Sequence, residues 1–164
     1  MTAKRRLTHV DASGRARMVD VGQKPETARE AVARGEVIMR PQTLRLIQAN
    51  QVAKGDVLTL AQVAGVMAAK RTHELIPLCH AIPLTDVQVT CRPKPPDRVT
   101  IEAVARTVGR TGVEMEALVA VAVAALTIYD MCKATDRELT VARVRLVAKR
   151  GGRSGEFRRE GEAT

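Results

Sequence analysis

Residues 112–134 read GVEMEALVAVAVAALTIYDMCKA, an almost uninterrupted apolar segment with two glutamates near its start and Asp130 and Lys133 near its end. A helix that is apolar on all sides is typical of a protein core. A charged group in apolar surroundings costs several kcal/mol unless it is paired or used in function. The segment therefore predicts the long core helix of the fold, and its charged ends indicate an active site.

The composition is that of one globular domain with an aliphatic core. The chain has 164 residues, of which 45% are hydrophobic, 27% charged and only 1% aromatic, which is enough to bury a core without disulfides. The three cysteines follow no metal-binding spacing, which favours a reducing, cytoplasmic environment. Residues 1–14 lack the apolar region typical of a signal peptide, so none is expected, and the longest apolar run, 117–129, is shorter than the ~20 residues that span a bilayer. We therefore expect a soluble protein.

The spacing of apolar residues predicts several helices. Residues 25–33 begin with proline and continue with alanine, glutamate and arginine, a composition that favours a helix. Residues 41–49 also have helical spacing, and Asp56 is a suitable N-cap for a helix over 57–75. Gly65 lies inside that helix, where it costs about 1 kcal/mol relative to alanine. We expect close packing or ligand approach at this glycine.

Alternating apolar residues predict strands elsewhere. Residues 85–92 and 98–107 each place apolar side chains on one face, and the PKPPD turn between them indicates an antiparallel hairpin. Short strands are also expected at 18–21 and 36–40, and a last strand at 139–148. Helices and antiparallel strands in this order predict an α+β sandwich, an antiparallel sheet covered on one face by helices.

No internal repeat, low-complexity tract or linker divides the chain. We expect a loosely ordered segment at residues 1–17, a single α+β catalytic domain at residues 18–150 and a flexible basic tail at residues 151–164. The net charge of +9 indicates an anionic partner: nucleic acid, a membrane surface or a phosphorylated small molecule. The scarcity of aromatic residues counts against binding of single-stranded nucleic acid.

The charged residues at the two ends of the apolar segment are candidate site residues. Asp130 and Lys133 share a helix face, either as a surface ion pair or as catalytic groups, and their apolar neighbours favour the catalytic interpretation. Glu114 and Glu116 lie in the first turn, where carboxylates favour the positive end of a helix. The two glutamates flank Met115, and their carboxylate oxygens could also accept hydrogen bonds from the N–H groups of a purine or pterin ring.

A histidine and a set of lysines are further candidates. His80, beside Cys79 in a loop between two prolines, is either a structural histidine or a donor to a substrate oxygen. Four lysines lie at the ends of predicted elements: Lys54, Lys70, Lys133 and Lys149. Because element ends meet at one rim of a small sandwich, we expect these lysines to converge on a polyphosphate. Neighbouring lysines lower one another's pKa, which would make one of them a usable acid or base.

Four stretches of the chain together resemble one known family: MVDVGQK (18–24), KGDVLTLAQVAGVMAAKRTHELIPLCH (54–80), GVEMEALVAVAVAALTIYDMCKA (112–134) and VRLVAKRGGRSG (144–155). The family is that of cyclic pyranopterin monophosphate synthase, the molybdenum-cofactor biosynthesis protein C. The resemblance implies a ferredoxin-like fold and a lyase that converts 3′,8-cyclised GTP to cyclic pyranopterin monophosphate with release of pyrophosphate. This conversion is an early step of molybdenum cofactor (molybdopterin) biosynthesis.

The resemblance also implies how the protein assembles and what it requires. Members of the family form cytoplasmic hexamers, trimers of dimers, with active sites at subunit interfaces. They are functionally linked to an upstream radical S-adenosylmethionine cyclase. The resemblance implies neither a membrane partner nor a specific nucleic-acid partner. No redox cofactor is required, and Mg²⁺ is allowed with the triphosphate. A basic nucleic-acid-binding module and a non-catalytic nucleotide-binding subunit are the alternatives.

Individual site residues follow from the matched motifs. The catalytic positions are Asp130, as acid or base, with Lys133 and Lys54. The substrate-binding positions are Leu78, Cys79, His80, Glu114, Met115, Glu116, Lys70, Lys149 and Arg29. The last three of these would hold phosphates, and no residue is expected to bind a metal.

The chain departs from the family motifs at two places. Ala81 stands where the family usually has proline after LCH, so the loop backbone is expected to differ slightly. Arg153 replaces the lysine of GGKSG, which keeps the charge but changes its geometry. The two charged ends of residues 112–134 would lie some 20 Å or more apart, at ~1.5 Å rise per residue. One small nucleotide cannot reach both, so we expect two pockets that are completed across a subunit interface.

Overall fold

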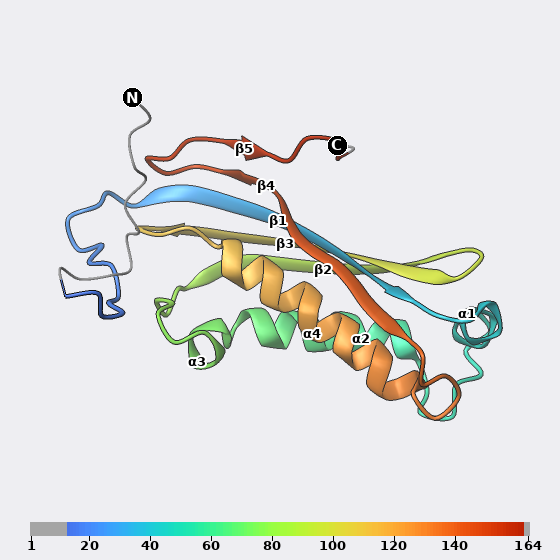
Figure 1. Ribbon diagram of the computed structural model, residues 1–164. Helices are drawn as coiled ribbons and strands as arrows, with labels where there is room; N and C mark the ends of the chain where they lie inside the picture. Colours follow the sequence, from blue (N-terminus) through green and yellow to red (C-terminus); the bar gives the residue numbers. More distant parts are fainter. Residues whose placement is uncertain (1–12, 163–164) are drawn as a thin grey trace.

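The computed structural model describes residues 13–162, in which a twisted sheet lies over two long helices (Figure 1). The strands are β1 (Thr27–Ile38), β2 (Leu84–Lys94), β3 (Arg98–Gly109), β4 (Thr140–Arg150) and β5 (Phe157–Arg158). The helices are α1 (Pro41–Gln48), α2 (Val57–Ala69), α3 (Thr72–Leu75) and α4 (Glu114–Cys132). Residues 1–12 and 163–164 lie outside the described part of the chain, so the expectation for residues 1–17 falls mostly outside it.

The sheet has the strand order β2-β3-β1-β4-β5, and all neighbouring strands are antiparallel. The order along the chain, β1-α2-β2-β3-α4-β4, is the β-α-β-β-α-β arrangement of ferredoxin-like folds. Helices α2 and α4 pack on each other and against the same face of the sheet (Figure 1). The predicted α+β fold, a sheet covered on one face by helices, is confirmed.

Local patterns predicted most elements close to their observed positions. Helices α1 and α4, the β2–β3 hairpin and strand β4 all occur as expected. The Asp56 side chain accepts a hydrogen bond from the backbone N–H of Thr59 at 3.0 Å, so the predicted N-cap of α2 is confirmed. The helix predicted over 57–75 is divided, because α2 ends at Ala69 and the single turn α3 follows.

The helix predicted over residues 25–33 is wrong, because this segment forms most of β1. Strand β1 lies between β3 and β4 and pairs with β3 along its whole length. Ala31, Ala33 and Val37 point to the helix side and are all 0% exposed. Burial in a central strand therefore outweighs the preference of alanine for helices. The strand predicted at 18–21 is also wrong, since these residues have no regular secondary structure.

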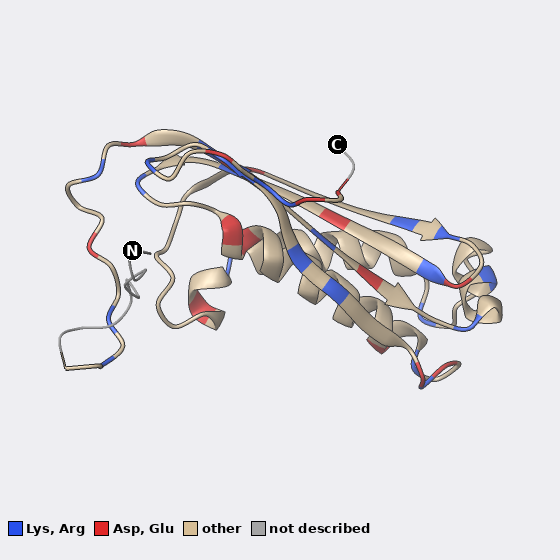
Figure 2. Ribbon diagram, turned by 45° about the horizontal axis from the view of Figure 1, so that its top comes forward, with Lys and Arg blue, Asp and Glu red and all other residues tan. Residues whose placement is uncertain are grey.

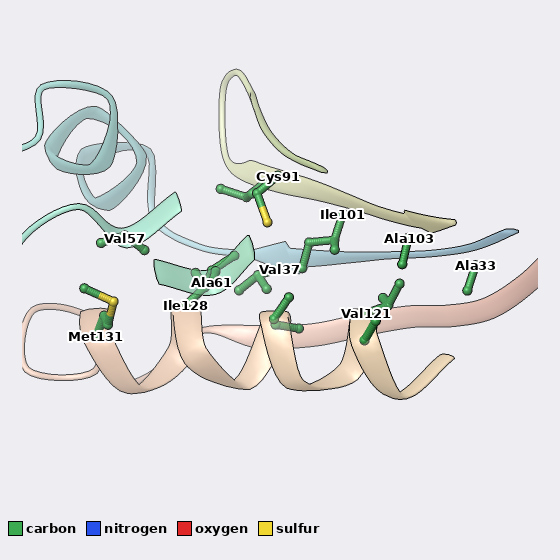
Figure 3. Close-up of a cluster of buried hydrophobic side chains, with 14 of the residues drawn as sticks. Ala33, Val37, Val57, Ala61, Cys91, Ile101, Ala103, Val121, Ile128 and Met131 are labelled. Atoms are coloured by element: carbon green, nitrogen blue, oxygen red, sulfur yellow. The ribbon is translucent and has the colours of Figure 1, made fainter. Parts of the chain in front are cut away.

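The core between sheet and helices is aliphatic, as the composition predicted. Figure 3 shows Val121 and Ile128 of α4 beside the strands that carry Val37 and Ile101, and all four side chains are 0–1% exposed. By length and composition α4 could cross a membrane, but 56% of its apolar window is buried inside the fold. Helix α4 is thus the core helix of a folded domain.

Gly65 allows α2 to approach α4 and the sheet closely. A Cβ at this position would lie 2.9 Å from the carbonyl oxygen of Ala120 and 3.1 Å from Cγ2 of Val89. Real Cβ atoms do not come so close to backbone, so a larger residue would push the helices apart. Of the two reasons expected for this glycine, close packing is the one that the structure shows.

Charged residues lie mainly on the strands and at the two ends of the molecule, while the middle turns of α2 and α4 are uncharged (Figure 2). On the sheet face away from the helices, acids and arginines pair across strands: Arg106 with Glu30 and Arg34 with Glu102, each at 2.6 Å. The segment after β4, expected to be a flexible tail, contains β5, which pairs with β4. Near its end, Glu162 forms an ion pair with Arg34 at 3.1 Å.

Candidate active site

A cavity of about 660 Å³ opens beside the first turn of α4. Six of the substrate-binding residues expected from the sequence line it: Leu78, Cys79, His80, Glu114, Met115 and Glu116. They come from two segments that are more than thirty residues apart in the chain, the loop after α3 and the start of α4. The fold therefore brings these residues together around one hollow.

Other residues that line the cavity were missed from the sequence. Val19, Val21 and Lys24 come from the irregular segment before β1, and Ile76 and Ile82 flank the LCH loop. Irregular segments have no periodicity by which their inward-facing residues can be recognised. The MVDVGQK motif (18–24) contains three of these residues, but the family resemblance gave no role to any single residue of it.

The two glutamates of the first turn of α4 differ in their surroundings. Glu116 is 4% exposed, and its burial, together with the charge of Glu114, raises its pKa to about 7. Glu114 is more exposed and lies 3.8 Å from the ammonium of Lys149. Burial also raises the pKa of the neighbouring Cys79 thiol. At neutral pH the cavity thus contains one carboxyl group near its midpoint, Glu116, and a protonated thiol, Cys79.

His80 connects the LCH loop to the segment before β1. Its Nε2 lies 2.9 Å from the carbonyl oxygen of Val19. A carbonyl oxygen can only accept, so Nε2 carries the hydrogen and donates it. In the free protein His80 therefore has a structural bond, while its ring still lines the cavity.

Three residues expected to hold phosphates differ in position. Arg29 Nε donates to the carbonyl oxygen of Gly109 at 2.8 Å, and a Cβ on Gly152 would clash with its guanidinium. Lys149 donates to the hydroxyl of Ser154 in the same glycine-rich loop. Arg29, Lys149 and this loop therefore lie close together beside the start of α4. Lys70 is the exposed C-cap residue of α2 and is not among the residues that line the cavity.

The expected catalytic residues lie at the other end of α4. Asp130 pairs with Lys54 at 2.8 Å and with Lys133 at 2.6 Å. All three side chains are about half exposed, at 55%, 48% and 53%. Asp130 therefore does not lie in the apolar surroundings that the sequence indicated, because it projects from the end of the core helix.

The two lysines hold Asp130 in its ionised form. Hydrogen bonds from Lys133 and then Lys54 lower the pKa of Asp130 to about 2. The same bond and charge raise the pKa of Lys133. At Lys133 the expectation that clustered lysines lower one another's pKa is wrong, because the Asp130 carboxylate beside it raises its pKa instead. In the free chain, Asp130 is a fixed negative charge.

The expected convergence of four lysines on one rim is wrong for a single chain. Lys54 and Lys133 flank Asp130 at the last turn of α4, whereas Lys149 lies beside Glu114 at its first turn. The sixteen residues from the first turn to the last correspond to about 24 Å. The chain thus carries two separate groups of expected site residues, one at each end of α4.

A buried acid that the sequence did not indicate lies near the second group. Asp136 is 1% exposed and accepts hydrogen bonds from the backbone of Arg40 at 2.8 Å and the hydroxyl of Thr43 at 3.1 Å. Burial opposes its ionisation, but the bonds from Arg40, Glu138 and Thr43 outweigh this and lower its pKa. Its bonds are satisfied by the start of α1, so its role is structural.

Comparison with known proteins assigns the family. The sequence pattern of the MoaC family matches residues 18–152, which include both ends of α4 and the segment before β1. The chain belongs to the MoaC family. The family resemblance drawn from the four motifs is therefore confirmed.

Similar MoaC-family proteins carry one common name, cyclic pyranopterin monophosphate synthase. That of Thermomicrobium roseum is 63% identical over 155 residues, which cover 94% of this chain and 93% of the relative. That of Pelotomaculum thermopropionicum is 64% identical over 157 residues, or 95% and 92% of the two chains. That of Chloroflexus aggregans is 60% identical over 158 residues, or 96% of each.

Proposed function

We propose that the protein is a cyclic pyranopterin monophosphate synthase, a lyase that converts 3′,8-cyclised GTP to cyclic pyranopterin monophosphate and pyrophosphate. The observation that carries the proposal is the 60%, 63% and 64% identity to relatives of that name, over at least 92% of each chain compared.

The cavity suits a purine-derived ring. Its volume of about 660 Å³ is within the usual range of small-molecule sites. Val19, Val21 and Ile76 offer apolar walls for a flat ring, and Glu114 and Glu116 offer acceptors for ring N–H groups. Arg29 and Lys149, beside the glycine-rich loop, would hold phosphate oxygens.

Release of pyrophosphate defines what the site must accomplish. A sugar hydroxyl oxygen forms a bond to the α-phosphorus, the bond from that phosphorus to the bridging oxygen breaks, and pyrophosphate leaves with the electron pair. The hydroxyl proton passes to a base. No cofactor is required for this step, and a Mg²⁺ ion, where one accompanies the substrate, would be carried by its phosphates.

The surroundings of each carboxyl group set its pKa, and the pKa decides which proton transfers the group can carry out. Glu116, with a pKa of about 7, can hold or release a proton at physiological pH. Asp130, with a pKa of about 2, supports a role as acid or base only if substrate binding displaces one of its lysines. Until then, Asp130 orients Lys54 and Lys133, whose ammonium groups would stabilise the departing pyrophosphate.

The separation of the two ends supports an active site shared between chains. We infer a hexamer, a trimer of dimers, in which the first turn of α4 in one subunit faces the last turn of α4 in another. The setting would be cytoplasmic, with a radical S-adenosylmethionine cyclase supplying the substrate. A nucleic-acid-binding role is disfavoured, because many arginines of the open sheet face are already paired with acids.

The test is conversion of the 3′,8-cyclised nucleotide by the purified protein. We expect one pyrophosphate and one cyclic pyranopterin monophosphate per substrate consumed, measured by mass spectrometry and a pyrophosphate assay. GTP itself should not be converted. Binding of the cyclised nucleotide without any product would identify a non-catalytic nucleotide-binding subunit and refute the proposal.

A further inference from the structure

Beyond β4 the chain turns back and forms a hairpin with β5. The loop of this hairpin is the glycine-rich loop, residues 151–156, and β5 pairs with β4 at Ala148 and Lys149. Figure 1 shows the hairpin in red, with its loop at the end of the molecule where α4 begins. Residues 157–162, called the return segment from here on, follow the loop. The family pattern matches residues 18–152, so the return segment lies outside it.

The glycine-rich loop lies against the start of β1. A Cβ at Gly151 would overlap the carbonyl oxygen of Ala28, and a Cβ at Gly152 would overlap the guanidinium of Arg29. A turn closed by the Gly155 N–H on the Gly152 carbonyl at 3.1 Å shapes the loop. The loop therefore reaches its place beside Arg29 through close contacts that depend on the path of its backbone.

Hydrogen bonds to β4 alone give the return segment a weak hold on the sheet. Strand β5 has two residues, and beyond it the backbone N–H of Arg159 donates to the carbonyl of Val147 at 2.8 Å. Arg159 Nε also donates to the carbonyl of Leu146, at 2.8 Å. Residues 157–161 are all exposed. Exposed segments with few hydrogen bonds to a sheet open locally at a low free energy, so this one stays closed only if a stronger contact holds its end.

Glu162, the last residue that the structure describes, makes this stronger contact. Its carboxylate pairs with Arg145 of β4 and, at 3.1 Å, with Arg34 of β1. The Glu162 side chain is 12% exposed, so the two ion pairs are largely shielded from water. Burial opposes ionisation of Glu162, but the hydrogen bonds from Arg145 and Arg34 outweigh it and lower its pKa. Because shielded, charge-assisted pairs are stronger than pairs on an open surface, Glu162 fastens the return segment to two strands.

We propose that Glu162 is a positioning residue of the active site: by fastening the return segment, it holds the glycine-rich loop in the path that phosphate binding requires. The proposal deepens the proposed function and rests on it for the identity of the substrate. The contacts run from Glu162 to Arg145 on β4, then along the pairing of β4 with β5 at Lys149, and so to the loop beside Arg29. An ion pair that only stabilised the fold would change the melting temperature but not the affinity for phosphates.

The first test measures local opening and substrate affinity in Glu162→Gln. Hydrogen–deuterium exchange in residues 147–161 should quicken about tenfold, and the KM for 3′,8-cyclised GTP and the calorimetric Kd for pyrophosphate should each rise about tenfold. Exchange in α4 and kcat should change little. Glu162→Asp, which keeps the charge, should recover part of the loss. The matched control is Glu160→Gln, at an exposed acid of the same segment that has no partner among residues 13–162, and it should match the wild type.

Two results of this test would overturn the proposal. Faster exchange in Glu162→Gln with unchanged KM and unchanged pyrophosphate affinity would show that the ion pairs serve stability alone. Exchange at the wild-type rate would show that Glu162 does not hold the return segment.

The second test asks whether Glu162 acts through Arg145. Arg145→Met should raise KM several-fold, and the double variant Glu162→Gln/Arg145→Met should be no worse than Glu162→Gln alone. Glu102→Gln removes another ion pair of Arg34, at 2.6 Å, but leaves the Glu162 carboxylate in place, so it should keep the wild-type KM. Additive losses in the double variant would show that Glu162 and Arg145 act independently and would contradict the proposed path.

Binding and turnover separate the role of Glu162 from the proposed function, because pyrophosphate binding needs no reaction. If the wild type binds pyrophosphate without converting the cyclised nucleotide, and Glu162→Gln binds pyrophosphate more weakly, only the proposed function is refuted. If the wild type converts the nucleotide and Glu162→Gln keeps its KM, only the role of Glu162 is refuted. A wild type that neither converts the nucleotide nor binds pyrophosphate would overturn both.

Discussion

The two ends of helix α4 carry the same kind of charged group in opposite surroundings. At the first turn, Glu116 is 4% exposed and its pKa rises to about 7. At the last turn, the Asp130 side chain is 55% exposed and two lysines lower its pKa to about 2. One carboxyl is ready to exchange a proton, and the other is held as a fixed charge. Burial and partners, rather than residue type, decide which role each can take.

The largest expected effect concerns the ionised end. Asp130→Ala or Lys54→Ala should lower turnover of the cyclised nucleotide roughly 10²–10⁴-fold, the range for loss of a positioned proton-transfer or charge-stabilising group. Because these side chains are about half exposed, both variants should keep the wild-type circular dichroism spectrum and melting curve. Arg137→Ala, in the exposed loop after α4, is the matched control. Near wild-type conversion by Asp130→Ala would show that the last turn of α4 is not part of the active site.

Mixing variants tests whether the two ends act together across chains. Asp130→Ala and Glu116→Ala proteins, each poorly active alone, should recover up to about a quarter of wild-type activity when unfolded and refolded together in equal amounts. In a random mixture, about one shared site in four combines an intact first turn with an intact last turn. Activity that stays at the level of the separate variants would show that each chain carries its own complete site.

The buried end should make stability depend on pH. The pKa of Glu116, about 7, lies above that of an unfolded glutamate, so from about pH 4.5 to 7 the folded chain binds a proton that the unfolded chain has lost. The free energy of unfolding should therefore fall as pH rises through this window, by up to about 2 kcal/mol after allowance for solvent screening. Urea unfolding at pH 5, 6, 7 and 8 should show the slope in the wild type and a flatter one in Glu116→Gln. Equal slopes would mean that Glu116 is ionised when folded.

The smallest expected effect is the corresponding change at the exposed end. The pKa of Asp130, about 2, lies below its ordinary value, so its contribution to stability is present above about pH 4 and is lost as pH falls below that. Asp130→Asn should therefore leave the slope between pH 5 and 8 unchanged. If Asp130→Asn changed this slope as much as Glu116→Gln does, the proposed difference between the two carboxyl groups would be refuted.

Elements with strong local patterns were predictable, and elements that depend on long-range pairing were less so. Helix α4 follows from its continuous apolar sequence, and α2 from its spacing and the Asp56 N-cap. Residues 25–33 were predicted as a helix because alanine and arginine favour one locally. They form β1 because two partner strands and α4 bury them, and those partners are 60 to more than 100 residues away in sequence.

The candidate site was predictable to a similar extent. The LCH loop and the first turn of α4 were correctly expected to lie together, because their motifs match one family. Val19, Val21 and Lys24, which line the cavity, were not found, since an irregular segment gives no indication of which side chains face a cavity. The lysines were placed on one rim because element ends were assumed to meet, although α4 separates Lys54 from Lys149 by most of its length.

The sequence alone determined the family, the core helix and the identity of the charged groups at its ends, because motifs and apolar runs are local properties of the chain. Only the tertiary structure decided that Glu116 is buried and near neutral while Asp130 is half exposed and ionised. It also decided that the irregular segment before β1 lines the cavity. Solvent exposure and distances between charges depend on contacts between segments far apart in the chain, and these contacts set the pKa of each group.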